Sequence, residues 1–206
     1  MSARKKVEIT EPFDYDDTYA KLVQSMSSLH ISRIDEMPRI ELYRDQLISI
    51  VQTELAPLYG PDEKIVTGSM VNNYVKQHVM PAPTRKRYTR RHLASLLFVC
   101  TFKRVLPIAQ VTLLYELCRD AEVDFARAYD QLADALEQTL AARFGATATS
   151  ADVLSAPIAL VNLRGEPVTG TLPSLLQNAI SLIANKVYIE QMLSLEAKRE
   201  RSVTSE

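Results

Sequence analysis

The fold is decided by the stretch Thr67-Gly-Ser-Met-Val-Asn-Asn-Tyr-Val-Lys-Gln-His-Val-Met-Pro81, which leads on to Thr84-Arg-Lys-Arg-Tyr88. Thr67 is a favoured N-cap residue, so we expect a short helix from residue 68 to about residue 78. The prolines at 81 and 83 should end that helix, because proline lacks the amide hydrogen that a helix needs. A short basic hairpin is expected over residues 84–88, with Tyr88 anchoring it on the neighbouring helices.

Apolar residues at three- and four-residue spacing predict further helices on both sides of this stretch. We expect them over residues 15–29, 40–59, 90–105 (capped by Thr89), 107–119, 123–144 and 173–201. The last is apolar around more than one face, so it should be central to the core, form a dimer interface, or both. Residues 158–161 are a candidate strand, with a turn at 164–167, and residues 1–12 are expected to be disordered. The chain is therefore predicted to be mainly α.

Charge is strongly segregated along the chain. The formal net charge is −1, with 24 basic and 25 acidic residues. Between Lys64 and Tyr115, however, there is no Asp or Glu, and nine of the 24 basic residues lie in this window. The remainder holds 15 basic residues against all 25 acidic ones. DNA affinity depends on the local density of cations that face phosphate, so this distribution favours a nucleic-acid partner over a solvated basic face.

The expected helix after Thr67 has one polar face. Val71, Tyr74 and Val75 should face the core. The opposite face carries the candidate base-reading residues Ser69, Asn72, Asn73, Lys76 and Gln77. A single helix fits the major groove, where Asn and Gln can bond an adenine edge through two atoms. Candidate phosphate contacts follow in the hairpin and at the start of the next helix: Arg85, Lys86, Arg87, Arg90 and Arg91.

These motifs resemble the DNA-binding module of MerR-type regulators. Residues 67–81 resemble the recognition helix with its proline exit, and residues 85–93 resemble the wing and the capped helix after it. Residues 106–114 resemble the helix that follows. The runs Glu41-Leu-Tyr-Arg-Asp-Gln46 and Met70-Val-Asn-Asn-Tyr-Val-Lys76 are similar to a bacterial family of unknown function with a MerR-like helix-turn-helix. The resemblance implies a winged helix-turn-helix with additional N- and C-terminal helices, contact with double-stranded DNA, and a homodimer.

The resemblance divides the chain into three regions. Residues 1–35 are expected to form a flexible segment with a short helix, and residues 36–118 a MerR-like winged helix-turn-helix domain. Residues 119–206 are expected to be a helical region that dimerises or receives a signal. A small-molecule effector is a candidate partner of that last region.

No catalytic constellation is visible in the sequence. There is no Gly-rich phosphate loop and no Gly-x-Ser-x-Gly motif. His78 and His92 fall in the basic module, where such residues could touch phosphate but are more often polar surface. No His or Cys pair has metal-ligand spacing, and Cys118 is alone near the start of the expected dimerisation region, so a buried apolar role is expected for it. We therefore expect no enzymatic activity, no cofactor and no metal.

The sequence also bears on location. No signal peptide is visible, and no apolar run is long enough to span a bilayer. We expect a cytoplasmic protein with no membrane partner.

The leading interpretation is a sequence-specific, DNA-binding transcriptional regulator that acts as a homodimer on a nearly palindromic site. The alternative is a protein-interaction module that keeps the helix-turn-helix scaffold but binds an acidic partner through its basic face. A third reading is an enzyme with a site between the C-terminal helices, although no residue points to one.

Overall fold

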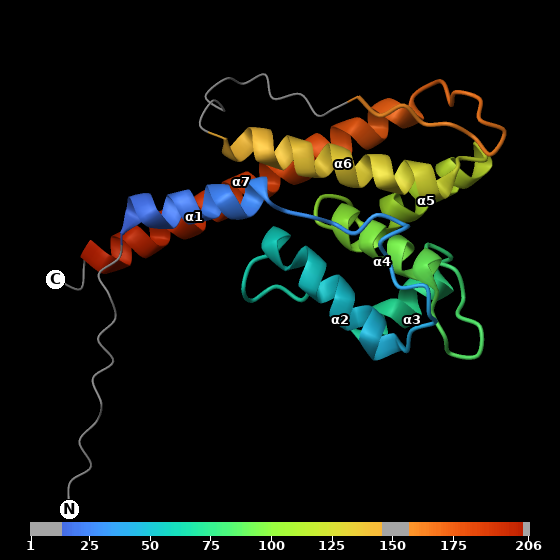
Figure 1. Ribbon diagram of the computed structural model, residues 1–206, viewed down its shortest axis with the longest axis horizontal. Helices are drawn as coiled ribbons and strands as arrows, with labels where there is room; N and C mark the ends of the chain where they lie inside the picture. Colours follow the sequence, from blue (N-terminus) through green and yellow to red (C-terminus); the bar gives the residue numbers. More distant parts are fainter. Residues whose placement is uncertain (1–13, 146–156, 204–206) are drawn as a thin grey trace, which may run out of the picture.

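The computed structural model describes residues 14–145 and 157–203 of the 206-residue chain. Over these ranges it forms helices and no β-strand (Figure 1). The elements are α1 (Tyr15–Ser27), α2 (Arg44–Leu55), the 3-10 helix η1 (Ala56–Leu58), α3 (Gly68–Lys76), α4 (Arg90–Phe102), α5 (Ile108–Asp120), α6 (Phe125–Phe144) and α7 (Leu172–Val203). The expectation of a mainly α fold is confirmed. None of these helices is long and apolar enough to cross a membrane.

α4 is the buried centre of the fold. Every residue from His92 to Phe102 is buried, and α2, α5 and α7 pack against the helix. Its start is capped at Thr89, whose amide donates to Nδ1 of His92 at 3.0 Å. Nε2 of His92 lies 3.2 Å from the Ala82 carbonyl oxygen and is therefore the nitrogen that carries the hydrogen. His92 thus supports the helix start from within the core.

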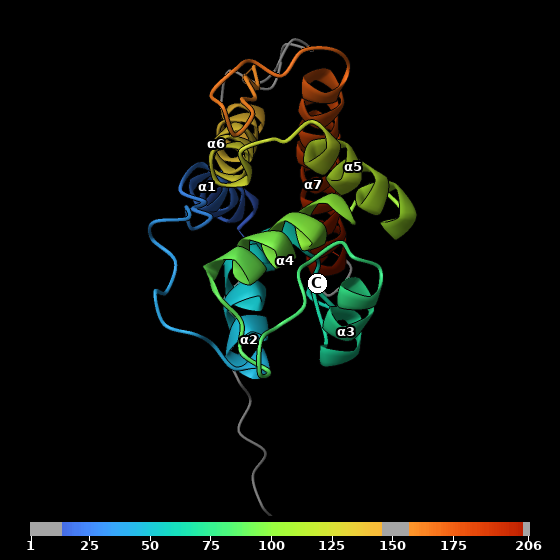
Figure 2. The ribbon, with the colours of Figure 1, turned by 90° about the vertical axis from the view of Figure 1, so that its right-hand side faces the viewer.

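The other helices lie on two sides of α4 (Figures 1 and 2). On one side α6 and α7 pack along each other, and α1 packs against both. The Tyr15 hydroxyl donates to Oε1 of Glu196, near the C-terminal end of α7, at 2.9 Å. On the other side lie α2 and α3. A continuous hydrophobic core extends from Met26 to Val187.

Two expected elements differ in the structure. The helix expected over residues 40–59 begins only at Arg44, because Leu42 is extended and pairs with Tyr88 through backbone hydrogen bonds of 2.7 and 2.9 Å. It ends at Leu55, where η1 follows. The strand expected at residues 158–161 does not form: Val161 makes an isolated bridge to Pro167 and its carbonyl accepts from the Asp124 amide at 2.9 Å, but no continuous ladder results. The prediction for residues 1–12 lies outside the described residues.

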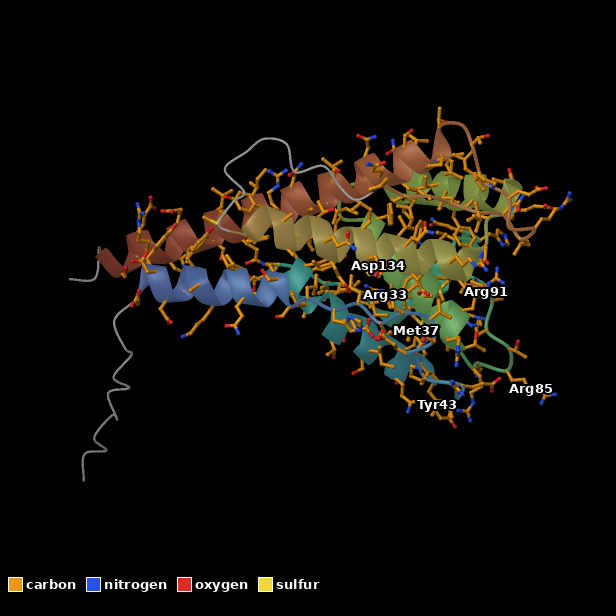
Figure 3. The ribbon with its side chains drawn as sticks, turned by 45° about the horizontal axis from the view of Figure 1, so that its top comes forward. Arg33, Met37, Tyr43, Arg85, Arg91 and Asp134 are labelled. Carbon is orange, nitrogen blue, oxygen red and sulfur yellow. The ribbon has the colours of Figure 1, made fainter. Side chains whose placement is uncertain are left out.

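The segment between α1 and α2 is held on α6 by ion pairs and hydrogen bonds. The Arg33 guanidinium contacts Asp134 at 2.6 Å and Glu137 at 2.6 Å, as Figure 3 shows for the first pair. Glu137 also accepts from the Ile31 amide at 2.7 Å, and Asp130 accepts from the Ile34 amide at 2.9 Å. The side chains of Arg33 and Glu137 are only 16% and 19% exposed, so this attachment is shielded from solvent.

We expect Arg33→Ala to lower the free energy of unfolding by about 2 kcal/mol, because it leaves a half-buried carboxylate without its charged partner. Urea unfolding measures the change. Arg119→Ala is the control: its pair with Asp120 is solvent-exposed, and its loss should cost less than about 0.5 kcal/mol. Equal losses for the two variants would contradict the structural role of Arg33.

Candidate nucleic-acid interface

α3 is a short helix with both ends defined by local hydrogen bonds. At its start, Thr67 Oγ1 accepts from the Met70 amide at 3.3 Å, as the sequence predicts. At its end, the amides of His78 and Val79 donate to the carbonyls of Val75 and Tyr74, both at 3.1 Å, with His78 at φ 57°. This is the Schellman pattern, in which a left-handed residue closes the helix. The helix therefore stops at Lys76, before the prolines are reached.

One face of α3 is polar and open to solvent. Val71 and Tyr74 are buried, whereas Ser69, Asn72, Asn73 and Lys76 are exposed. The four exposed residues and Met70 line one shallow groove. Gln77 differs from its expected outward position, because it is half-buried and its Oε1 atom is shielded from solvent. The groove therefore presents one hydroxyl, two amides and one ammonium group on adjacent turns of a helix.

The expected hairpin is reduced to a tight turn. Thr84 and Arg87 form an isolated antiparallel bridge, and the Arg87 amide donates to the Thr84 carbonyl at 2.9 Å. The two central residues, Arg85 and Lys86, have φ angles of 50° and 61°, as a type I′ turn requires. Both are exposed, and Figure 3 shows Arg85 projecting from the edge of the molecule. The turn thus holds two cations away from the body of the protein.

The structure does not establish a winged helix-turn-helix. No strands flank the turn within the described residues, so there is no β-wing there. α2 and α3 are joined by residues 56–67, whereas a helix-turn-helix typically has a connection of three or four residues. The structure shows a capped polar helix that is followed in the sequence by a basic turn.

Arg87 lies against the protein surface. Its guanidinium carbon lies 3.6 Å from the centroid of the Tyr43 ring, and Nη2 donates to the Tyr43 hydroxyl at 2.6 Å. Tyr88, the next residue, is buried and pairs with Leu42. The turn is therefore fastened to the segment that precedes α2. Tyr43, which the helical pattern places on an apolar face, is 56% exposed and takes part in this contact.

The cations at the start of α4 lie apart from the α3 groove. The Arg91 guanidinium carbon lies 5.6 Å from the centroid of Phe125, the first residue of α6, and Figure 3 shows Arg91 on that side. Arg90 is half-buried. Figure 2 draws α3 and the start of α4 on either side of α2. The candidate residues on α3 therefore lie apart from those at the start of α4.

Arg44 is a neighbour of α3 that sequence reasoning missed. A Cβ atom built on Gly68, the first residue of α3, would lie 3.3 Å from the Arg44 guanidinium carbon. The absent side chain of Gly68 therefore makes room for a cation beside the N-terminus of α3, where helix amides also attract anions. Among the described residues, the carboxylate that pairs with the Arg44 guanidinium within 4.0 Å is that of the adjacent Asp45, at 3.7 Å and 90% exposed. No sequence spacing pointed to this pair.

Metal and thiol chemistry has no support in the part of the chain that the structure describes. No group of three or more potential metal-binding side chains occurs there. Burial raises the pKa of the Cys100 thiol to about 12 and that of Cys118 to about 11. Both cysteines are therefore protonated near neutral pH, which makes them poor nucleophiles and poor metal ligands.

Residues 32–132 match the family model described as Domain of unknown function (DUF1836). This agrees with the expected similarity to a family of unknown function but does not support its MerR-like part. The comparisons with curated proteins and with solved structures gave no match. The matched residues include α3 and the turn, so both belong to the part of the chain that this family model describes.

We expect Lys86→Gly to raise the free energy of unfolding by about 1 kcal/mol, because glycine adopts the left-handed conformation without the steric cost that lysine has there. Lys86→Ala removes the same charge but keeps a Cβ atom, so it should give no such gain. Parallel urea titrations of the two variants separate the backbone effect from the charge effect. An equal change in both would show that the turn is not strained.

Proposed function

We propose that the protein is a sequence-specific DNA-binding transcriptional regulator that acts as a homodimer and inserts α3 into the major groove. The observation that carries the proposal is the exposed polar face of α3, with Ser69, Asn72, Asn73 and Lys76 lining one groove. This helix lies in a window, Lys64 to Tyr115, that contains no acidic residue.

The side chains on α3 suit the chemistry of base edges. The major groove accommodates one α-helix, and Asn bonds an adenine through its N6 and N7 atoms. Asn72 and Asn73 offer that pairing from adjacent positions, and Ser69 can bond several bases. Lys76 is exposed at the end of the helix, where it can contact a phosphate or a guanine.

The cations around α3 suit the DNA backbone. Arg44 lies at the N-terminus of α3, and Arg85 and Lys86 occupy the tip of the turn that follows the helix. Phosphate contacts of this kind fix the register of a recognition helix without reading sequence. The pairing of Arg87 with Tyr43 keeps the turn at a fixed distance from α2.

An apolar stripe on α7 supports the homodimer. Leu175, Leu182 and Ile189 are 48%, 50% and 55% exposed and follow one another at intervals of seven residues. Leu113 and Leu117 of α5 line a groove together with Leu175 and Leu182. A heptad-spaced apolar stripe is the pattern by which one helix packs on another, and a second copy presents the same stripe. A two-fold dimer would carry two α3 helices to a nearly palindromic site.

The test of DNA recognition is a genomic pull-down at near-physiological salt, followed by sequencing of the retained DNA. The wild type should enrich a few sites that share a nearly palindromic motif. Asn72→Ala should retain DNA with an altered motif, because it removes a base contact. Arg85→Ala/Lys86→Ala should weaken binding to every sequence. The slope of the logarithm of affinity against the logarithm of salt concentration should fall in magnitude by about two, because two phosphate contacts are lost.

Lys21→Ala/Lys198→Ala is the matched control, since it removes two exposed cations remote in sequence from the basic window. This variant should behave as the wild type. Retention without enrichment by the wild type would favour a basic surface for an acidic protein partner. An unchanged motif for Asn72→Ala would exclude Asn72 as a reader.

We expect Leu182→Glu to convert a dimer into a monomer with little change in stability, because it places a charge in the α7 stripe at a half-exposed position. Sedimentation equilibrium measures the molar mass. Leu163→Glu is the control, since Leu163 is 73% exposed and lies outside α7. A wild type that stays monomeric at high concentration would contradict the dimer.

A further inference from the structure

A second concave site lies where the start of α4, the end of α5 and the start of α6 meet. It encloses a cavity of about 70 Å³. Four aromatic side chains line it: Phe98, Tyr115, Phe125 and Tyr129. Two arginines, Arg91 and Arg119, also line it, and its lining contains no acidic residue. The site therefore combines apolar walls with positive charge.

The aromatic rings support one another, so the cavity is preformed. Tyr115 and Phe125 meet edge to face at 6.4 Å between ring centroids, and Phe125 and Tyr129 stack at 6.4 Å. The Tyr129 hydroxyl donates to the Ser32 carbonyl at 3.0 Å, which fixes that ring from outside the cavity. Fixed walls let a ligand bind without ordering the side chains first.

The charge at this site is only partly neutralised by the described residues. Arg91 makes no ion pair with a carboxylate within the described residues, and its guanidinium carbon lies 5.6 Å from the centroid of Phe125. Arg119 pairs only with its neighbour Asp120, at 3.0 Å and 67% exposed. Arginine presents a planar fork of donors that matches a carboxylate.

We propose that this pocket binds a small organic carboxylate with a short apolar chain, whose carboxylate group pairs with Arg91. The cavity of about 70 Å³ sets the size of the chain. A cavity of this size holds a few water molecules or a short hydrocarbon chain, while the carboxylate stays at the arginines.

The position of Arg91 suggests a regulatory role for such a ligand, and this part rests on the proposed function. Arg91 adjoins the cap at Thr89 and His92, and Thr89 directly follows the turn that ends at Tyr88. A carboxylate on Arg91 would join the start of α4 to the α5–α6 side of the pocket. Ligand binding would therefore act on the start of α4, which closely follows the basic turn.

The experiment titrates the full-length protein with 3-methylbutanoate in a calorimeter, without DNA. Acetate, octanoate and the neutral 3-methylbutanamide serve as comparison ligands. We expect 3-methylbutanoate to bind more tightly than acetate or octanoate, and the amide to bind at least about tenfold more weakly. Arg91→Gln should weaken 3-methylbutanoate binding about tenfold, whereas the control Lys198→Gln, at an exposed position near the C-terminal end of α7, should leave its affinity unchanged.

Several outcomes would overturn the proposal: no binding of 3-methylbutanoate, equal binding of acid and amide, or equal binding by Arg91→Gln and the wild type. Arg91 is exposed, so Arg91→Gln should remain folded, and circular dichroism checks this. The titration and the genomic pull-down test the pocket and the DNA-binding proposal separately, so a negative result in one does not decide the other. Arg91-dependent binding without DNA recognition would retain the pocket and discard the regulator, and the reverse result would discard the pocket alone.

Discussion

The covering of α4 on every side is the constraint on which the rest of the structure depends. A helix with no solvent-facing side requires neighbours all around it and an internal partner for each polar group at its ends. Thr89 and His92 meet that need at the start. At the far end Arg104, with a side chain only 1% exposed, pairs with Glu63 at 3.0 Å and with Glu190 of α7. The Tyr59 hydroxyl donates to the Cys100 carbonyl at 2.5 Å. These bonds fix residues 59–66, and with them the point from which α3 departs.

Sequence reasoning succeeded where the determining interactions are local. The cap at Thr67 depends on residues three positions apart, and the buried face of α3 depends on helical spacing, so both could be predicted. It failed where the partner is distant in sequence. The bridge between Leu42 and Tyr88 shortens α2, and the contact between Arg44 and Gly68 brings a cation to α3. The apolar run at residues 158–161 resembles a strand, but its hydrogen bonds to Asp124 and Val168 and its bridge to Pro167 do not form a continuous ladder.

Backbone strain is concentrated around α3 and the turn. Among the described residues, the non-glycine positions with positive φ are His78, Arg85, Lys86 and Glu122, and the first three follow α3 closely. Glycine would adopt this conformation at lower cost. The chain instead keeps an imidazole and two cations at strained positions, where they add positive charge and hydrogen-bonding capacity to the exposed surface. Strain of this kind persists where the surrounding structure enforces it, and functional sites are where it tends to gather.

The packing of α1 joins segments that are far apart in the sequence and are therefore synthesised at different times. Its side chains find their partners on α6 and near the C-terminal end of α7, as in the bond from Tyr15 to Glu196. The ribosome synthesises α1 well before α6 and α7, so the apolar side of α1 has no native surface to cover it in the interval. Contacts of such long sequence separation form late, because closing the intervening loop costs chain entropy before any contact repays it. The growing chain must therefore carry an amphipathic helix without its native partners until α6 and α7 have been synthesised, a period in which aggregation or binding by a chaperone competes with folding.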